Sequence, residues 1–321
     1  MIKELSIEIT RKCPNMCVHC SSMSSYGCIE MISLGKFKEV VASAVTLGLE
    51  TVCFSGGEPF LHPDIVEMIN YVYSLGVQSY VYSSGICVGA DGERESISEY
   101  ILTQICKKVT KLIINVEASE EKIYDTIMGS AGCFELMKKT IESAVALGIM
   151  VEGHFVPMKY NMNQIEDTLQ MCSDLGVSKV SFLRLVVHGR ATCNKEKIVL
   201  NDEELASVEA LLKKIYENNQ YAIRIGVPLK GESSDVHCEA ANGKINIRYD
   251  GKVFPCEVFK NNSIGVLSGI EPDSIFDSDF ASIYNKSNYL NFVRKLVQEF
   301  SCGNCCDNCV GQYYMKISEE E

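Results

Sequence analysis

Short apolar segments alternate with longer amphipathic segments along the first two thirds of the chain. Six of the short segments have the length and composition of buried strands, and they cover residues 5–10, 51–54, 79–82, 112–116, 151–156 and 179–185. Each is followed by a segment with the apolar spacing of a helix, most clearly at residues 34–47 and 205–215. The second of these helices begins with Asn201 and Glu204, which resemble a capping box.

The same two residues end four of the predicted helices. A leucine is followed by a glycine at Leu47-Gly48, Leu75-Gly76, Leu147-Gly148 and Leu175-Gly176. Glycine suits the left-handed position just after a helix. Six strand–helix units imply parallel strands joined by right-handed crossovers, in a complete or partial barrel or an open sheet. Chemistry is then expected in the loops that leave the carboxyl ends of the strands.

The pattern changes after about residue 221. Residues 244–259 alternate apolar and polar positions on both sides of Asp250-Gly251, which predicts a β-hairpin. A helix is predicted at roughly residues 281–298, and a cysteine-dense segment follows at residues 302–309. A length of 321 residues favours a large domain and a smaller one. We therefore expect an α/β core at residues 1–220 and a hairpin-plus-helix domain at residues 221–321.

Composition and charge exclude several classes of protein. With 46% hydrophobic and 22% charged residues the chain is globular rather than disordered. Its net charge of -12 argues against a nucleic-acid partner, because such binding depends on clustered basic residues. No apolar run reaches the roughly 18 residues of a membrane span, and residues 1–10 lack the regions of a secretory signal. We expect a cytoplasmic protein that binds neither nucleic acid nor membrane.

The sixteen cysteines are too many for ordinary usage, and in a reducing compartment such a surplus indicates metal or redox chemistry. Cys13, Cys17 and Cys20 form C-x3-C-x2-C directly after the first predicted strand. Three thiolates can ligate three irons of a [4Fe-4S] cluster and leave the fourth iron open to a substrate. The alternative is structural zinc, but that ion needs four ligands, and His19 is badly placed to join its neighbour Cys20 on one ion.

A second motif, Ser55-Gly56-Gly57-Glu58-Pro59, ends the second predicted strand. Paired glycines let backbone carbonyls approach a ligand closely, and a fixed carboxylate suits an ammonium group. On its own this sequence is typical of an ordinary turn. Beside an open-iron cysteine loop it favours a binding site.

With these two motifs, in this order and on these strands, the chain resembles the radical S-adenosylmethionine (SAM) enzymes. The resemblance implies a partial (β/α)6 barrel resembling the TIM barrel. It implies that Cys13, Cys17 and Cys20 ligate a [4Fe-4S] cluster whose open iron binds SAM, and that a 5′-deoxyadenosyl radical abstracts hydrogen from a substrate. It also implies that Gly56-Gly57-Glu58 grips the methionine ammonium and that His19 lies beside the adenine.

Weaker matches to the same family follow the third and fourth strands. Ser83 lies in a YSSG stretch that resembles the family's Thr-Asn-Gly, with Ser84 in place of the asparagine. Asn115 stands where many relatives have the serine of Ser-x-Asp, with Glu117 in place of the aspartate. The resemblance implies that Ser83 and Asn115 contact the cofactor.

The segment after the sixth strand resembles the family's Arg-x-x-x-x-Gly-Arg-Ala stretch through Arg184 and Gly189-Arg190-Ala191. An arginine here suits a carboxylate through paired hydrogen bonds, so Arg184 is a further cofactor-binding candidate. Cys193 follows in the same loop and could return a hydrogen atom to a product radical. The alternative reading of Cys193 is an ordinary loop cysteine.

The C-terminal cysteines resemble the auxiliary-cluster domains called SPASM and twitch. Cys238, twelve residues, Gly251, four residues and Cys256 match their opening, and CGNCCDNC follows near the end. The resemblance implies one auxiliary [4Fe-4S] cluster, because the chain has too few cysteines for two. Its predicted ligands are Cys238, Cys256, Cys302 and Cys305, with Cys309 almost as well placed. The alternative is a structural zinc on the terminal cysteines.

The resemblance implies an oxidoreductase or maturase that most closely fits modification of a ribosomally synthesised peptide, by a crosslink, a thioether or epimerisation. The runner-up is oxidation of a small molecule. An alternative from another class is a non-catalytic zinc or iron–sulfur binding protein, which does not account for Gly-Gly-Glu at a strand end. The resemblance also implies a flavodoxin or ferredoxin as electron donor. Many peptide-modifying relatives carry an amino-terminal peptide-recognition domain, whereas the first barrel strand here begins at about Leu5. This weakens the peptide interpretation without eliminating it, because the recognition module could be a separate protein.

Overall fold

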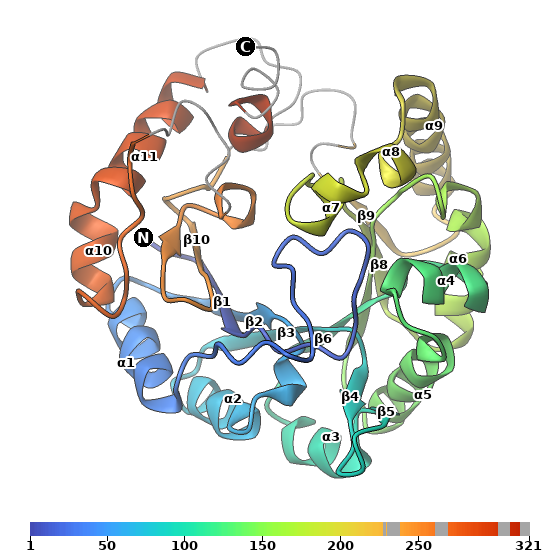
Figure 1. Cartoon of the computed structure of the whole chain (residues 1–321), viewed down its shortest axis with the longest axis horizontal. Helices are drawn as coiled ribbons and strands as arrows, with labels where there is room; N and C mark the ends of the chain where they lie inside the picture. Colours follow the sequence, from blue (N-terminus) through green and yellow to red (C-terminus); the bar gives the residue numbers. More distant parts are fainter. Residues whose placement is uncertain (227–228, 230–237, 261–268, 301–308, 315–321) are drawn as a thin grey trace.

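The computed structural model describes residues 1–226, 229, 238–260, 269–300 and 309–314. It contains one strongly curved, mostly parallel sheet with helices along its outer side (Figure 1). This is the predicted α/β fold, a partial barrel. Among the described residues, no helix is long and apolar enough to cross a bilayer.

The six predicted strands are confirmed and lie side by side in chain order. From one edge to the other, the sheet consists of β11 (Val253–Phe254), β10 (Lys244–Ile247), β1 (Glu4–Thr10), β2 (Thr51–Gly56), β3 (Gln78–Ser83), β6 (Lys111–Asn115), β7 (Val151–Phe155), β8 (Lys179–Phe182) and β9 (Ile223–Ile225). Strand β8 ends at Phe182 rather than at residue 185, because its neighbour β9 pairs with it only as far as Ile225. A small separate hairpin, β4 (Ile86–Val88) and β5 (Arg94–Ser96), was not predicted.

Helices follow the strands as expected. They are α1 (Leu34–Val45), α2 (Ile65–Ser74), α3 (Glu99–Ile105), α4 (Glu121–Met128), α5 (Cys133–Ala146), α6 (Ile165–Asp174), α7 (Arg190–Cys193), α8 (Lys195–Ile198), α9 (Asp202–Asn218), α10 (Phe280–Lys286) and α11 (Asn288–Phe300), with short 3-10 helices η1 (Pro59–Leu61), η2 (Met162–Gln164) and η4 (Glu257–Phe259). The capping box of Asn201 and Glu204 is present at α9. The glycines of all four Leu-Gly endings have positive φ, as predicted for the left-handed position.

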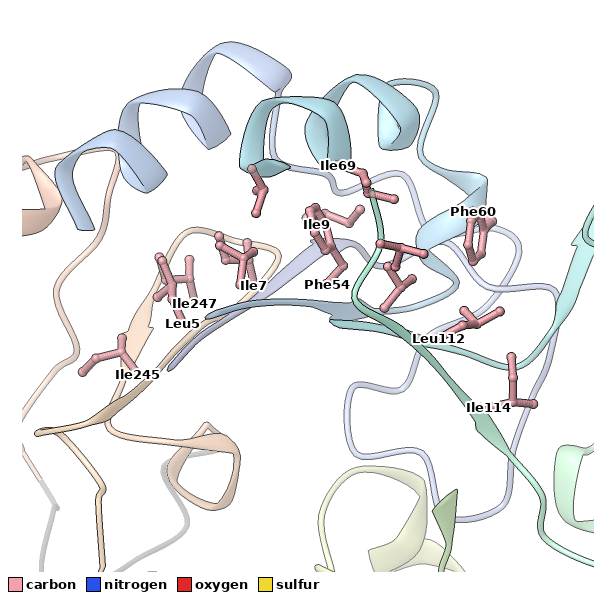
Figure 2. Packing of buried hydrophobic residues seen from close by; sticks show 14 of the residues in the cluster. Leu5, Ile7, Ile9, Phe54, Phe60, Ile69, Leu112, Ile114, Ile245 and Ile247 are labelled. Carbon is pink, nitrogen blue, oxygen red and sulfur yellow. The ribbon is translucent and has the colours of Figure 1, made fainter. Parts of the chain in front are cut away.

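The main core lies between the sheet and the outer helices. Alternate residues of β1 point to opposite faces, and Leu5, Ile7 and Ile9 pack on the helix side together with Phe54 (Figure 2). Burying each such side chain contributes about 1.5–3 kcal/mol. The residues between them, among them Glu8, lie on the inner face of the curved sheet. That face is therefore polar, and it is where the chemistry of the sequence motifs must be sought.

The predicted C-terminal hairpin is confirmed. Its Gly251 has φ +79° at the turn, and β10 pairs in parallel with β1, so that the hairpin continues the barrel sheet. The single helix predicted at residues 281–298 is wrong. Ser287 has extended backbone (ψ 125°) and its hydroxyl accepts a hydrogen bond from the Leu290 N–H at 3.1 Å, so the segment divides into α10 and α11. The domain boundary at residue 220 stays a prediction.

Candidate functional site

The first predicted site lies in the loop of residues 11–33, here called the cysteine loop, which joins β1 to α1 and lies inside the ring of strands (Figure 1). Neighbouring elements hold its backbone. The amides of Met16 and Val18 donate to the carbonyls of Met128 (3.1 Å) and Ile127 (2.9 Å) at the end of α4. Arg94, on the hairpin that the sequence did not predict, donates twice to the Pro14 carbonyl, at 3.0 and 2.8 Å. Contacts with the barrel thus add to the hydrogen bonds within the loop, in which the Cys13 N–H donates to the Ser25 carbonyl at 3.1 Å and the Cys20 N–H to the Cys17 carbonyl at 3.2 Å.

Arg190 holds the cysteine loop through three hydrogen bonds to its backbone carbonyls. Its Nε donates to the Cys17 carbonyl at 2.8 Å, its Nη1 to the Ser24 carbonyl at 2.9 Å, and its backbone N–H to the Cys20 carbonyl at 3.0 Å. Gly189 allows this approach, because a Cβ there would lie 2.5 Å from the Ser21 carbonyl oxygen. The sequence had suggested that an arginine in this stretch would suit a carboxylate. These contacts of Arg190 go to backbone carbonyls instead.

The cysteine loop brings the thiols of Cys13, Cys17 and Cys20 into one another's electrostatic neighbourhood. Burial, followed by the two neighbouring thiols, raises the pKa of Cys17 well above its ordinary value. Buried thiolates are costly unless a cation compensates their charge. Across the described ranges, no group of three or more His, Cys, Asp or Glu side chains is close enough to hold a single metal ion.

The two glycines at the end of β2 pack directly against the cysteine loop. The Gly57 N–H donates to the Thr10 carbonyl at 2.7 Å, and the Glu58 N–H donates to the Lys12 carbonyl at 2.8 Å. A Cβ at Gly57 would lie 2.1 Å from the Lys12 carbonyl oxygen, and one at Gly56 would lie 2.3 Å from that of Thr10. Side chains are therefore excluded at both positions, which joins the two sequence motifs into one site.

The carboxylate of Glu58 is fully buried and holds β2 and β3 together. It accepts hydrogen bonds from the Ser83 hydroxyl (2.7 Å), the Ser84 N–H (2.8 Å), the Ser84 hydroxyl (2.6 Å) and the Phe60 N–H (3.3 Å). Burial raises the pKa of Glu58, and these donors oppose that effect. A carboxylate has about four lone-pair sites, so an ammonium group would compete with these donors. The glycine carbonyls beside it are a better place for one.

His19, Asn115 and Glu117 meet at the carboxyl end of β6. Glu117 is fully buried, accepts hydrogen bonds from Asn115 Nδ2 (3.3 Å) and the Val156 N–H (3.0 Å), and lies 3.6 Å from His19 Nε2. Burial raises the pKa of Glu117 to about 7, while burial and then Arg190 lower that of His19 to about 4. The Nδ1 atom of His19 is buried and, within the described ranges, has no hydrogen-bond partner. An orphaned polar atom at this position suits a ligand.

The two remaining candidates from the barrel lie after β8. Arg184 is half-buried, two residues beyond the end of β8 and therefore at the same edge of the sheet. Cys193 is exposed at the end of α7. No contact ties Cys193 to the inner face in the described part of the chain, and its role as a hydrogen donor stays a prediction.

Three of the predicted auxiliary ligands also come together. Burial, then Glu257 and the thiols of Cys309 and Cys238, raises the pKa of Cys256 well above its ordinary value. Cys238 and Cys256 pack against the edge of the main core. The other two predicted ligands, Cys302 and Cys305, lie outside the described residues. The three thiols that come together, those of Cys238, Cys256 and Cys309, are contributed by sequence positions up to 71 residues apart.

The inner face of the barrel carries polar groups that the sequence analysis did not select. The Tyr82 and His154 rings meet edge to face, with centroids 5.3 Å apart, and the hydroxyls of Ser6 and Ser55 lie 3.3 Å apart. Glu8 on β1 forms a buried ion pair with Lys260. The available signal was local, because polar residues alternate with apolar ones along β1, but nothing in the sequence identified their partners.

Two family models match the chain. The model described as the radical SAM superfamily matches residues 7–172, more than half of the chain, and the SPASM model, described as an iron-sulfur cluster-binding domain, matches residues 238–310. The PqqA peptide cyclase of Bradyrhizobium diazoefficiens is 23% identical over 299 residues, which cover 90% of this chain and 74% of that protein. The PqqA peptide cyclase of Rhizobium meliloti is 23% identical over 292 residues, covering 89% of this chain and 74% of the relative.

Solved structures share the fold. Streptococcus suis SuiB bound to S-adenosylmethionine has a TM-score of 0.74 at 16% identity, covering 92% of this chain and 68% of SuiB. Native anSMEcpe with bound AdoMet and Cp18Cys peptide has a TM-score of 0.70 at 14% identity, covering 100% of this chain and 95% of that one. At such identities the likeness extends to the fold alone.

Proposed function

The chain belongs to the radical SAM superfamily, and from this premise we propose that Cys13, Cys17 and Cys20 hold the [4Fe-4S] cluster to which SAM binds. Once reduced, a cluster held by these thiols would supply the electron for cleavage of SAM to a 5′-deoxyadenosyl radical, and that radical would take a hydrogen atom from the substrate. The observation that carries the assignment is the gathering of three thiols, two glycines and the orphaned His19 nitrogen at one edge of the sheet. The family makes the protein an enzyme, so the non-catalytic alternative is set aside.

The residues around the thiols have separate tasks in this proposal. The carbonyls of Gly56 and Gly57 accept the methionine ammonium, and Glu58, fixed by Ser83 and its neighbour, keeps that segment in place. His19 lies against the adenine as a neutral ring, since its pKa is far below neutrality. Asn115 and Arg184 offer polar contacts to the remaining groups of the cofactor.

The C-terminal cysteines hold the single auxiliary [4Fe-4S] cluster. Its ligands are Cys238 and Cys256 together with Cys302 and Cys305, and Cys309 is the alternative fourth ligand. The match of the iron-sulfur domain to residues 238–310 and the convergence of Cys238, Cys256 and Cys309 support this assignment. With four cysteine ligands, the cluster is suited to accept the electron that a substrate radical gives up.

The substrate is a ribosomally synthesised peptide, and the reaction leaves a crosslink, a thioether or an inverted stereocentre. Two relatives named as peptide cyclases support this class. So do two solved structures that share the fold, SuiB bound to precursor peptide SuiA and anSMEcpe with a bound peptide. The polar inner face, with Tyr82 and His154 in contact, offers hydrogen bonds that a peptide backbone requires.

The protein works in the cytoplasm with a flavodoxin or ferredoxin as electron donor and a separate protein that recognises the peptide. The buried cysteines that this proposal does not use as ligands, Cys53, Cys87, Cys133 and Cys172, are free thiols, which fits a reducing compartment. The electron donor is tested by replacing dithionite with each reduced carrier in the assay that follows.

The test is anaerobic reconstitution followed by dithionite and SAM. 5′-Deoxyadenosine should accumulate with the native enzyme and be absent with Cys17→Ala. The peptide encoded by a neighbouring short reading frame is then added, alone and with its candidate recognition protein, and examined by mass spectrometry and chiral amino-acid analysis. An unchanged peptide beside abundant 5′-deoxyadenosine would contradict the substrate class. Absence of 5′-deoxyadenosine would contradict the site.

A further inference from the structure

Two opposite charges are buried where Lys260, of the C-terminal segment, meets the cysteine loop. Lys260 Nζ lies 2.5 Å from Glu8 Oε1, and the exposed fractions of the two side chains are 8% and 2%. The Ser22 hydroxyl completes the cluster, since it donates to Glu8 Oε1 at 2.9 Å and accepts from Lys260 Nζ at 2.9 Å. Within the described ranges the second carboxylate oxygen, Oε2, is buried without a hydrogen-bond partner. Such a pair is poorly explained as a source of stability, because desolvation of both charges offsets their attraction.

The group of Glu8, Ser22 and Lys260 links the two sets of cysteines, because two of its members are near them in the sequence. Ser22 follows Cys20 by two residues in the cysteine loop, and Lys260 follows Cys256 by four in the auxiliary segment. The charge of Lys260 is an electrostatic neighbour of the Cys20 thiol. The Lys260 Nζ atom also lies 2.9 Å from the hydroxyl of Ser22, two residues beyond Cys20. We therefore expect the cation to act on the N-terminal site.

Both ends of the connection are held rigidly. The Lys260 carbonyl accepts a hydrogen bond from Arg248 Nη1 at 2.8 Å, and the Ser22 carbonyl accepts one from Arg11 Nε at 3.2 Å. The Arg11 guanidinium also lies over the Tyr249 ring, 4.9 Å from its centroid. Lys260 is consequently fixed in both position and direction, with Glu8 on one side and the cysteine loop on the other.

A fixed buried cation stabilises nearby negative charge more strongly than an exposed one, because the surrounding dielectric is low. An iron–sulfur cluster becomes more negative when it is reduced, and its potential responds to net charge and hydrogen bonding around it. A cation beside Cys20 thus favours the reduced state. The carboxylate of Glu8, which is paired with Lys260, disfavours the reduced state.

We propose that Lys260 is a positioning residue which, paired with Glu8, ties the auxiliary segment to the cysteine loop and raises the reduction potential of the N-terminal cluster. The inference rests on the proposed function, because it requires a cluster on Cys13, Cys17 and Cys20. It gives the auxiliary segment a second task besides holding its own cluster. That task is to make the first cluster easier to reduce by the low-potential donor.

The experiment compares reduction potentials in reconstituted full-length enzyme by EPR-monitored redox titration. Lys260→Met should shift the potential of the N-terminal cluster downward, and Glu8→Gln should shift it upward. The auxiliary cluster should shift less in both variants. Lys252→Met is the matched control, because Lys252 lies in the neighbouring hairpin with 39% of its side chain exposed and should leave both potentials unchanged.

Opposite signs separate an electrostatic role from a merely structural one. If both variants shift the potential in the same direction, or neither shifts it, the proposal is overturned. If Lys260→Met alone fails to fold, Glu8→Gln is compared with the double variant Glu8→Gln/Lys260→Met. In Glu8→Gln the Lys260 charge has lost its partner, and the second substitution removes that charge. The double variant should then have a lower potential than Glu8→Gln, and an equal one overturns the proposal.

A conservative variant and the native enzyme complete the test. Lys260→Arg keeps the charge and should retain a potential close to the native value, whereas a potential like that of Lys260→Met would overturn the electrostatic assignment. Native enzyme that binds no N-terminal cluster would instead refute the proposed function. If the native enzyme binds the N-terminal cluster and cleaves SAM, but Lys260→Met and Glu8→Gln do not shift the reduction potential of that cluster, this inference alone is refuted.

Discussion

The cysteine loop and the C-terminal hairpin reach the same inner region by different kinds of contact. Much of the cysteine loop is held through its backbone carbonyls, by Arg190 and by the close approach of Gly57, and Ser22 adds a contact with the buried Lys260–Glu8 pair. The hairpin depends more on charged side chains, including an Arg248–Asp250 pair in which 20% and 33% of the side chains are exposed. Hydrogen bonds to backbone carbonyls do not depend on a titrating acceptor and are little affected by salt. Ion pairs between partly exposed side chains depend on both pH and salt. We therefore expect the first site to be the more robust and the second the more easily perturbed.

The largest expected effect comes from removing a thiol of the cysteine loop. Cys17→Ala should lower SAM cleavage at least about a thousandfold, a loss of ~4 kcal/mol, because the cluster would lose a ligand. The measurement is 5′-deoxyadenosine formed per enzyme after reconstitution. Cys193→Ala, at an exposed position, is the control for thiol loss and should retain SAM cleavage. Equal activity of Cys17→Ala and native enzyme would refute the ligand assignment.

Removing a thiol of the auxiliary group should separate the two sites. Cys256→Ala is expected to abolish peptide modification while SAM cleavage without peptide stays within about tenfold of the native rate. Iron analysis should show loss of one cluster and EPR should show retention of the other. Loss of SAM cleavage in step with peptide modification would mean that the two sites depend on each other more than their separate contacts imply.

Replacing Gly57 and, as a control, Gly35 by alanine tests the close packing of the cysteine loop. Gly57→Ala should destabilise the protein by about 1–3 kcal/mol or more, since its Cβ would lie 2.1 Å from a carbonyl oxygen. Gly35→Ala is the matched control within α1, where a Cβ meets nothing within 4 Å. It should stabilise the helix by about 0.5–1 kcal/mol. Urea unfolding measures both, and a destabilised Gly35→Ala beside a neutral Gly57→Ala would contradict the packing described.

The smallest effect is a pH dependence of the hairpin. Burial acts to raise the pKa of Asp250, but the hydrogen bonds and charge of Arg248 lower it below its ordinary value overall. A depressed pKa contributes stability that is present above the unfolded-state value of about 3.9 and is lost as the pH falls through the folded value. Asp250→Asn should therefore cost about 1 kcal/mol at neutral pH. In urea unfolding at decreasing pH the difference from native protein should shrink, and a constant difference would rule out the ion pair as its source.

Much of the fold could be predicted because its signals are local. Six apolar strands, the Leu-Gly helix endings and the Asp250-Gly251 turn depend on neighbouring residues in the sequence. The break between α10 and α11 was missed, because the capping serine, Ser287, lies within a continuous apolar pattern. The hairpin formed by β4 and β5 was missed because each of its strands has only three residues.

The candidate site was predictable where residue type and spacing carry the chemistry, as in Cys13, Cys17 and Cys20. Partners that are distant in the sequence were not. Glu8 and Lys260 are 252 residues apart, and no periodicity links them. Arg190 was noted only as part of a motif, and the motif does not show the backbone carbonyls that its guanidinium meets. The lesson is that motifs identify the reacting groups, while the groups that hold them depend on the tertiary fold.

The pairing of β10 with β1 also has a consequence for the newly made chain. Glu4 lies opposite Lys244, so the first barrel strand keeps one edge bare during synthesis until the hairpin has left the ribosome. Bare strand edges promote aggregation, and partly folded chains are exposed to it for longer when pairing spans great sequence distance. A nascent chain halted before the hairpin should accordingly require chaperones, because that edge is shielded only once residues 244–247 have been made.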